Sequence, residues 1–243
     1  MQSFACRPFG DAAVLVELGT TRDPELALQA SSLADSLSTW LASRSLDVVS
    51  GYCSVLVRFD PLTISPEEQL RAVTDALAAY TPHLDAEAAV GGEHRSSREH
   101  RPSREHNVRV CFGGEHGVDF ERTAHDLGMR ESRLRDMLCG GEFRVAFLGF
   151  LAGFPYLLGL PPALNGVDRL TRPRPRVPAG SMAIAAGQCG IYPRASAGGW
   201  RLLGRTNAVL FDPSHKPATL FAPFDRIRFE PVSDLRDASV TTT

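Results

Sequence analysis

The sequence predicts an α+β protein, with a small ferredoxin-like α/β unit over residues 1–90 and a β-barrel over residues 107–233. Three observations support this division. Strand and helix patterns follow the order β-α-β-β-α over the first 80 residues. Residues 91–106 contain no aliphatic residue and no Phe, Tyr or Trp. Residues 174–206 combine many glycines and prolines with short apolar runs, which is typical of short strands joined by turns.

The composition is that of an ordinary globular protein of 243 residues with a formal net charge of −2. This near balance gives no indication of nucleic-acid or membrane-surface binding. No apolar run approaches the roughly 20 residues of a membrane span, and the first residues lack the pattern of a signal peptide. Five scattered cysteines form no CxxC pair and have no zinc-ligand spacing. We therefore expect a cytoplasmic protein with reduced thiols, without a metal, nucleic-acid or membrane partner.

The first 80 residues carry two helix signals between strand-like runs. Asp23-Pro24 has the form of a helix start, and apolar residues follow at three- and four-residue spacing as far as Leu41. We expect Trp40, on that face, to lie in the core. Ser65 and Glu68 form a capping box for the second helix. The expected elements are strand 13–18, a helix over 23–41, strands 47–52 and 54–59, and a helix over 65–80.

Two segments are predicted to lack ordered structure. Residues 91–106 read GGEHRSSREHRPSREH, and such a segment buries too little apolar surface to order itself. We predict a charged linker there that separates two domains. Residues 234–243 are predicted to form a disordered tail.

The second half of the chain has the pattern of a closed or nearly closed barrel. Many short strand-like runs alternate with Gly and Pro turns. Asp119 is positioned to cap a short helix that ends at Gly128, and a second helix stops at Gly140; both are expected to plug or flank the barrel. The expected strands outside the glycine-rich stretch are 107–112, 143–148, 208–211, 219–221 and 226–232.

The glycine-rich stretch 174–206 is the first candidate site. Six glycines lie between Gly180 and Gly204, which excludes a helix. Bare glycine backbone beside arginines suits an anion or an amide-bearing ligand, while the alternative is that the glycines only form barrel corners. Cys189 lies in this stretch without an obvious base beside it in sequence, which argues against a nucleophilic role. Its polar residues at turn positions are Arg174, Arg176, Ser181, Gln188, Tyr192, Arg205 and Thr206.

The aromatic segment 147–162 is the second candidate. It reads FLGFLAGFPYLLGLPP, and its glycines and prolines exclude a helix. We expect Phe154, Pro155 and Tyr156 to form the aromatic rim of a pocket, and Phe147 to fill the barrel core.

These two segments resemble the signature segments of the allophanate hydrolase subunit 1 family, which includes the 5-oxoprolinase B subunit and the sporulation kinase inhibitor KipI. The matching segments are FLGFLAGFPYL (147–157) and RVPAGSMAIAAGQCGIYPRASAGGWRLLGRT (176–206). Weaker matches are FGDAAVLVELG near the N-terminus and VCFGGEHGVDFE at 110–121. The chain departs from the family pattern at several positions; Ala186 stands where Gly is usual and Cys189 where Thr is usual. The resemblance implies that the barrel is cyclophilin-like.

The resemblance also implies a function. Family members pair with a homologous allophanate hydrolase subunit 2, which corresponds to the 5-oxoprolinase C subunit. With a LamB/YcsF-like A subunit, the complex hydrolyses the small molecule 5-oxoproline to glutamate at the expense of ATP. The chain is then expected to be an ATP-dependent cyclic-amide hydrolase subunit that is inactive alone. The alternatives are a KipI-like inhibitor that binds a sensor histidine kinase, and a carboxyltransferase subunit of a urea or allophanate system.

Roles for individual residues follow from residue type and the family motif. No GxxxxGK[ST] or GxGxxG motif is present, so ATP, as a co-substrate of the complex, would lack a familiar cradle. Arginines could hold phosphate or carboxylate oxygens, and an amide or hydroxyl could polarise a carbonyl. The predicted catalytic residues are Gln188, Arg205 and Tyr192. The predicted substrate-binding residues are Phe154, Pro155, Tyr156, Arg174, Arg176, Gly180, Ser181, Gly187 and Gly190.

Overall fold

The computed structural model describes residues 4–21, 24–80 and 103–242. The chain divides into two compact units, Met1–Pro102 and Ser103–Thr243, which are described separately. The start of the first helix at Asp23 and residues 91–102 of the predicted linker lie outside the described residues. Among the described helices, none is long and apolar enough to cross a membrane.

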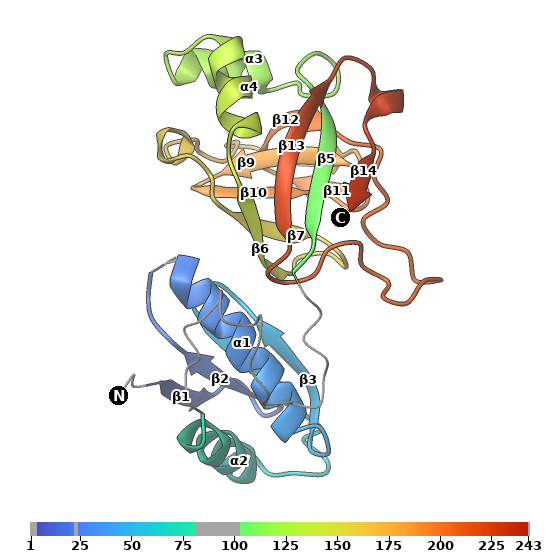
Figure 1. The fold of residues 1–243 in the computed structure, drawn as a ribbon. Helices are drawn as coiled ribbons and strands as arrows, with labels where there is room; N and C mark the ends of the chain where they lie inside the picture. Colours follow the sequence, from blue (N-terminus) through green and yellow to red (C-terminus); the bar gives the residue numbers. More distant parts are fainter. Residues whose placement is uncertain (1–3, 22–23, 81–102, 243) are drawn as a thin grey trace. The chain divides into compact units, whose positions relative to one another are not determined.

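The first unit is a four-stranded antiparallel sheet with two helices (Figure 1). The strand order is β1-β2-β4-β3, which places β2, β4 and β3 as in a ferredoxin-like sheet. The N-terminal strand β1 fills the outer position beside β2; its exposed, proline-ended sequence gave no strand signal. The elements are β1 (Ala5–Pro8), β2 (Ala13–Glu17), α1 (Pro24–Trp40), β3 (Ser45–Ser50), β4 (Ser54–Phe59) and α2 (Pro66–Ala78).

The core of this unit lies between the helices and one face of the sheet. Leu33 and Leu37 of α1 pack in one cluster with alternate residues of β2 and β4, such as Val14 and Val57. The predicted capping box is confirmed, since the Ser65 hydroxyl accepts the Glu68 N–H and the Glu68 carboxylate accepts the Ser65 N–H. The prediction for Trp40 is wrong. Trp40 ends α1, is 47% exposed and packs edge-to-face against Tyr80.

The second unit is a closed barrel of seven described strands (Figure 1). The order is β12-β9-β10-β7-β6-β13-β5, and a further β12–β5 pairing closes the ring. The pairings are antiparallel except for β13 with β5, which run parallel. The strands are β5 (Glu105–Phe112), β6 (Phe143–Leu148), β7 (Pro155–Leu158), β9 (Ser181–Ala185), β10 (Gln188–Ile191), β12 (Arg201–Arg205) and β13 (Arg226–Val232). These two units confirm the predicted α+β fold class.

Two helices close one end of the barrel. The helices α3 (Phe120–Asp126) and α4 (Glu131–Cys139) contribute Phe120, Leu134 and Leu138 to the same core cluster as the barrel interior. Around the barrel lie the 3-10 turns η1 (Pro162–Leu164) and η2 (Leu235–Asp237), the ribbon of β8 (Arg174–Val177) with β11 (Ser196–Gly198), and strand β14 (Val240–Thr242).

Three boundary predictions are wrong. The barrel begins before residue 107, because β5 starts at Glu105. The tail is ordered as far as Thr242, because β14 pairs antiparallel with β5, with Val240 opposite Val108. The expected strands 208–211 and 219–221 reduce to one bridge between Phe211 and Thr219. In the first two cases a partner distant in sequence decides the conformation, since β5 pairs with β13 and β14 pairs with β5.

A buried histidine fixes this C-terminal strand to the barrel. Asp225 accepts a hydrogen bond from His106 Nε2 at 2.9 Å and from the N–H groups of Ala222 and Arg104. His106 Nδ1 shares a second hydrogen bond, of 2.9 Å, with the Thr242 hydroxyl, which is able to donate or to accept. The network thus joins β5, β14 and the segment before β13.

Asp225→Ala should destabilise the barrel by about 3 kcal/mol, because it leaves the buried His106 N–H and two backbone N–H groups without an acceptor. Thr242→Val is the control. It removes one hydrogen bond at an exposed residue and should cost about 1 kcal/mol. Urea unfolding followed by a barrel-specific probe measures both. Equal losses for the two variants would contradict the central role of Asp225.

A two-residue hairpin joins β9 to β10 and gives a second prediction. Ala186 and Gly187 have φ of 49° and 74°, as a type I′ turn requires. A left-handed conformation costs a residue with a side chain about 1 kcal/mol. Ala186→Gly should therefore raise the free energy of unfolding by about 1 kcal/mol, whereas Gly187→Ala should lower it by a similar amount. An unchanged or reduced melting temperature for Ala186→Gly would contradict the prediction.

Candidate functional site

The glycine-rich stretch builds an aromatic layer on the outside of the barrel. Alternate residues of β9 and β10, such as Met182 and Cys189, belong to the interior core. The intervening residues, such as Ala183 and Ala185, face outward and lie in a separate cluster with Tyr192 and other side chains. We call the four large rings of this cluster the aromatic face. They are Phe154, Tyr156, Tyr192 and Trp200.

Phe154 is the centre of the aromatic face. Its ring centroid lies 5.1 Å from that of Tyr156, 5.2 Å from that of Tyr192 and 5.6 Å from that of Trp200. Gly190 lies directly beneath, since a Cβ there would come within 2.7 Å of the Phe154 ring. The predicted binding residue Gly190 therefore provides space for an aromatic ring.

The exposed rim differs from the prediction. Phe154 and Pro155 are buried and Tyr156 is half-buried, so of these three only Tyr156 reaches the surface. Phe150, which was not predicted, is 62% exposed and contacts Phe154 and Tyr192 edge-on. Its φ of 65° is unusual for a bulky residue and turns it toward these rings. Phe147 is buried but stacks on Tyr156, at 4.6 Å between centroids, rather than joining the interior core cluster.

Tyr192 is a neutral hydrogen-bond donor rather than a base. Burial raises the pKa of its phenol, and Tyr156 adds to that shift while Arg169 and Arg174 oppose it. Its hydroxyl lies against Gly198, where a Cβ would collide with it. At neutral pH the phenol O–H can therefore donate to a carbonyl oxygen or an oxyanion.

Asp119 holds the β8–β11 ribbon to the barrel. It occupies the N-cap position of α3, but its side chain makes no cap hydrogen bond, so the predicted capping role is wrong. One carboxylate oxygen accepts Arg174 Nη2 and the other accepts the Leu202 N–H, each at 2.7 Å. This use of both oxygens leaves Arg174 Nη1 buried without a hydrogen-bond partner among the described residues.

Gln188 lies at the other end of the outer face. It starts β10 opposite Ala185, is buried, and its Oε1 has no hydrogen-bond partner among the described residues. The neighbouring Gly187 forms the hairpin turn through its positive φ.

Arg205, Ser181 and Gly180 form a separate group. Ser181 is opposite Arg205, whose Nε donates to the Ala179 carbonyl at 2.8 Å, and a Cβ on Gly180 would collide with the Thr206 carbonyl. Because Gln188 and Arg205 pair with opposite ends of β9, they are separated by about 13 Å along the strand. Tyr192 lies toward the Arg205 end, since its N–H donates to the Ser181 carbonyl. The three predicted catalytic residues therefore do not converge on one bond.

A strongly basic surface adjoins the aromatic face. Between Arg169 and Phe211 the chain has seven arginines and no acidic residue, a signal that was available in the sequence. The predicted binding residue Arg176 is exposed and forms no ion pair with any described residue. The same holds for Arg169, Arg172 and Arg194, so we call these four residues the arginine ribbon.

The Cys189 thiol, the metal-ligating side chains and two hollows add nothing to this candidate site. Burial raises the pKa of the Cys189 thiol far above its usual value, which keeps it a thiol. No group of three His, Cys, Asp or Glu side chains in the described ranges is placed to hold a metal ion. The two hollows, of about 360 Å³ beside Cys111 and about 510 Å³ between α2 and the loops that follow α1 and precede α2, are lined by none of the predicted site residues. Neither of these two hollows therefore lies at the aromatic face.

Comparison with known proteins agrees with this architecture. Residues 4–221 match the family described as carboxyltransferase domain, subdomain C and D. The chain is 31% identical over 231 residues to the 5-oxoprolinase B subunit of Escherichia coli O157:H7, covering 95% of this chain and 97% of that protein. It is 25% identical over 248 residues to urea amidolyase of Lachancea kluyveri, covering 94% of this chain and 13% of that protein.

A solved structure supports the same relation. The crystal structure of TTHA0988 superposes with a TM-score of 0.73 at 29% identity, covering 91% of this chain and 40% of that one. The family match over residues 4–221 includes parts of both units and the signature segments that carry the aromatic face. The chain therefore belongs to the family of carboxyltransferase C and D domains that includes the 5-oxoprolinase B subunit.

Proposed function

We propose that this chain is the B-type subunit of a cytoplasmic 5-oxoprolinase complex, which opens the lactam of 5-oxoproline to glutamate at the expense of ATP. The support is the full-length similarity to the 5-oxoprolinase B subunit. A lactam is a stable amide, so its carbonyl must be activated before water can attack at neutral pH. Transfer of the ATP γ-phosphoryl group to the amide oxygen supplies that activation. Water then adds to the carbonyl carbon, the C–N bond breaks as the ring nitrogen takes a proton and leaves as an amine, and hydrolysis of the resulting acyl phosphate gives glutamate and phosphate.

The observation that carries the site is a pair of buried polar atoms without partners. Gln188 Oε1 and Arg174 Nη1 both lie in the layer outside the barrel and find no hydrogen bond among the described residues. Leaving such atoms unpaired costs about 1–3 kcal/mol each. A ligand amide that donates to Gln188 and an anionic group that accepts from Arg174 would offset this cost.

The separation of the polar groups suits two ligands. A single lactam cannot span the roughly 13 Å between the Gln188 and Arg205 ends of β9. We assign the Gln188 end to the lactam amide. The arginines 174, 176 and 205 are assigned to phosphate or carboxylate oxygens, which they can hold as charge-assisted hydrogen bonds. Tyr192, which lies toward the Arg205 end, supplies a neutral donor to the oxygens of the anionic group bound there.

We infer that a partner subunit completes the site. A small-molecule site buries most of its ligand, yet neither hollow lies at the aromatic face. Phe150 and the arginine ribbon remain exposed beside it. We assign the missing wall to a partner that resembles the 5-oxoprolinase C subunit, with a LamB/YcsF-like A subunit as the third component. The chain alone is then inactive.

The first test separates function from folding. Gln188→Leu removes a side-chain amide whose oxygen is buried and unpaired among the described residues, so the free energy of unfolding should stay level or rise by about 1 kcal/mol. In the assembled complex, ATP-dependent glutamate release from 5-oxoproline should fall at least about tenfold, equivalent to about 1.4 kcal/mol of transition-state stabilisation. Arg174→Lys, which keeps a cation beside Asp119, should show the same pattern. Arg122→Gln on α3 is the control.

Wild-type turnover by Gln188→Leu and Arg174→Lys would refute this site assignment. Glutamate release by the isolated chain would refute the shared site. If the assembled complex released no glutamate from 5-oxoproline with ATP, the proposed function itself would be wrong.

A second function is favoured by the similarity to urea amidolyase. As a carboxyltransferase subunit of a urea or allophanate system, the chain would use the same outer face. Its arginines would bind the carboxylate group of the ligand. The test is carboxylation of urea by the assembled complex supplied with a biotin carboxylase and its biotinylated carrier. Activity there, without glutamate release from 5-oxoproline, would replace the first proposal with the second.

A further inference from the structure

The smaller of the two hollows, beside Cys111, lies at the helix-covered end of the barrel, away from the aromatic face. Its volume is about 360 Å³, at the small end of the range for ligand sites. The parallel strands β5 and β13 both end there, with Cys111 opposite Val232. Because the chain leaves both strands at the same edge and then diverges, the space between the two exits stays open. Its lining residues are Cys111, Phe112, Arg135, Pro231, Val232 and Ser233.

Arg135 of α4 is the cation in this lining. Its guanidinium lies over the Phe120 ring, 5.9 Å from the centroid, and Phe112 packs against the same ring at 5.8 Å between centroids. The side chain is half-buried and makes no hydrogen bond or ion pair with any described residue. The aromatic contact orients the guanidinium, yet its fork of N–H donors remains unused.

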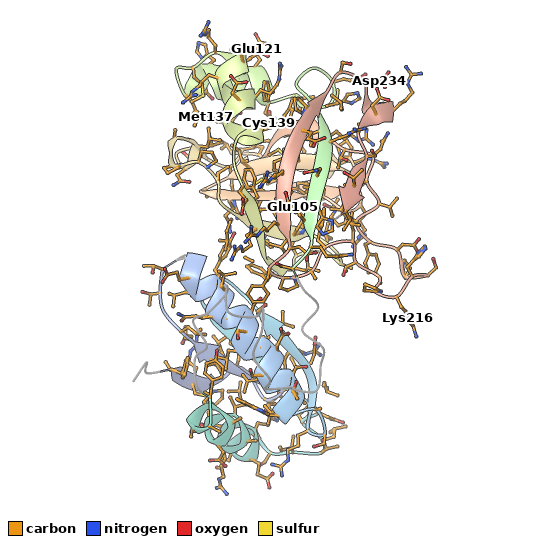
Figure 2. All side chains as sticks on the ribbon, in the orientation of Figure 1. Glu105, Glu121, Met137, Cys139, Lys216 and Asp234 are labelled. Atoms are coloured by element: carbon orange, nitrogen blue, oxygen red, sulfur yellow. The ribbon has the colours of Figure 1, made fainter. Side chains whose placement is uncertain are left out.

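Two of the acidic groups near the hollow, Asp234 and Glu230, form ion pairs with arginines, whereas burial and then the charges of Asp234 and Glu115 raise the pKa of the Cys111 thiol in the lining. Asp234 forms a bidentate pair with Arg236, which lowers the pKa of that carboxyl to about 2. Glu230 pairs with Arg109 at 3.5 Å, and Glu115 lies 3.8 Å from His116 Nε2. Asp136 follows Arg135 directly in α4 and so projects about 100° further round the helix. Figure 2 shows Asp234 and Cys139 at this same end of the barrel.

The rest of the lining is suited to an apolar body. Pro231, Val232 and Phe112 supply apolar surface. The Cys111 thiol is directed to the Ser233 carbonyl at 3.7 Å, which leaves that carbonyl occupied. One oriented cation beside the apolar wall of a small hollow with a mixed lining is complementary to a ligand that combines an anionic head with a flat apolar group.

The geometry points to a binding site for a small organic anion, a carboxylate or phosphate ester, in the hollow between α4 and the ends of β5 and β13, with Arg135 as its anchor. This site is separate from the aromatic face, and it stands whether or not the chain serves a 5-oxoprolinase. A ligand bound there would contact α4, one of the two helices that close this end of the barrel.

The test uses the full chain and four probes at constant ionic strength. Benzoate and phenyl phosphate carry an anionic head on a ring, benzamide is the neutral analogue of benzoate, and inorganic phosphate is the head alone. Calorimetry should show one saturable site for benzoate, phenyl phosphate or both, with benzamide and inorganic phosphate at least about tenfold weaker. Methyl chemical-shift changes should centre on Val232. The ratio of the two anions tells a carboxylate site from a phosphate site.

Two variants and one control test the assignment. Arg135→Gln removes the charge and should weaken anion binding at least about tenfold. Val232→Trp fills the hollow while Arg135 remains, and should abolish binding. Arg133→Gln changes a neighbouring exposed arginine of α4 and should leave affinity unchanged. The proposal is overturned if neither anion saturates, if Arg133→Gln and Arg135→Gln lose affinity equally, or if the shifts centre outside the hollow.

Discussion

The contact between Phe154 and Gly190 is the constraint on which the outer surface of the barrel depends. Because residue 190 has no side chain, the Phe154 ring packs against the β10 backbone, with two ring carbons 2.7 Å from where a Cβ would stand. A sheet face that would otherwise meet water thus becomes the floor of a second apolar cluster. Tyr192 and Trp200 pack edge-on around that ring, at centroid distances that aromatic pairs favour.

The electrostatics of the outer surface follow from how this cluster is fastened. Asp119 uses both carboxylate oxygens, on the β8–β11 ribbon through Arg174 and on β12 through the Leu202 N–H. The buried Asp119 carboxylate thus pairs with Arg174. The segment of Arg174, between Arg169 and Phe211, has no acidic residue of its own. Arg174 Nη1 and Gln188 Oε1 are left buried and unpaired among the described residues. Unpaired buried polar groups are expensive, so their retention is consistent with a surface completed by ligand or partner.

The one parallel pairing of the described barrel strands, β5 with β13, shapes the opposite part of the unit. At their amino ends the His106–Asp225 network and β14 fasten the two strands together. At their carboxyl ends the chains diverge and leave the hollow beside Arg135. The two strands therefore combine a rigid end, dense in hydrogen bonds, with an open end under α4.

Local chemistry in the sequence determined the α+β class, the capping box at Ser65 and the glycine-rich turns, because caps, breakers and apolar spacing act within a few residues. Only the tertiary structure decided the features that need a distant partner. Strand β14 exists because β5 offers it an edge, and Asp119 leaves its helix cap because Arg174 competes for its carboxylate. The distance between Gln188 and Arg205 depends on the register of β9 with β10 on one side and β12 on the other. No local sequence pattern encodes that register.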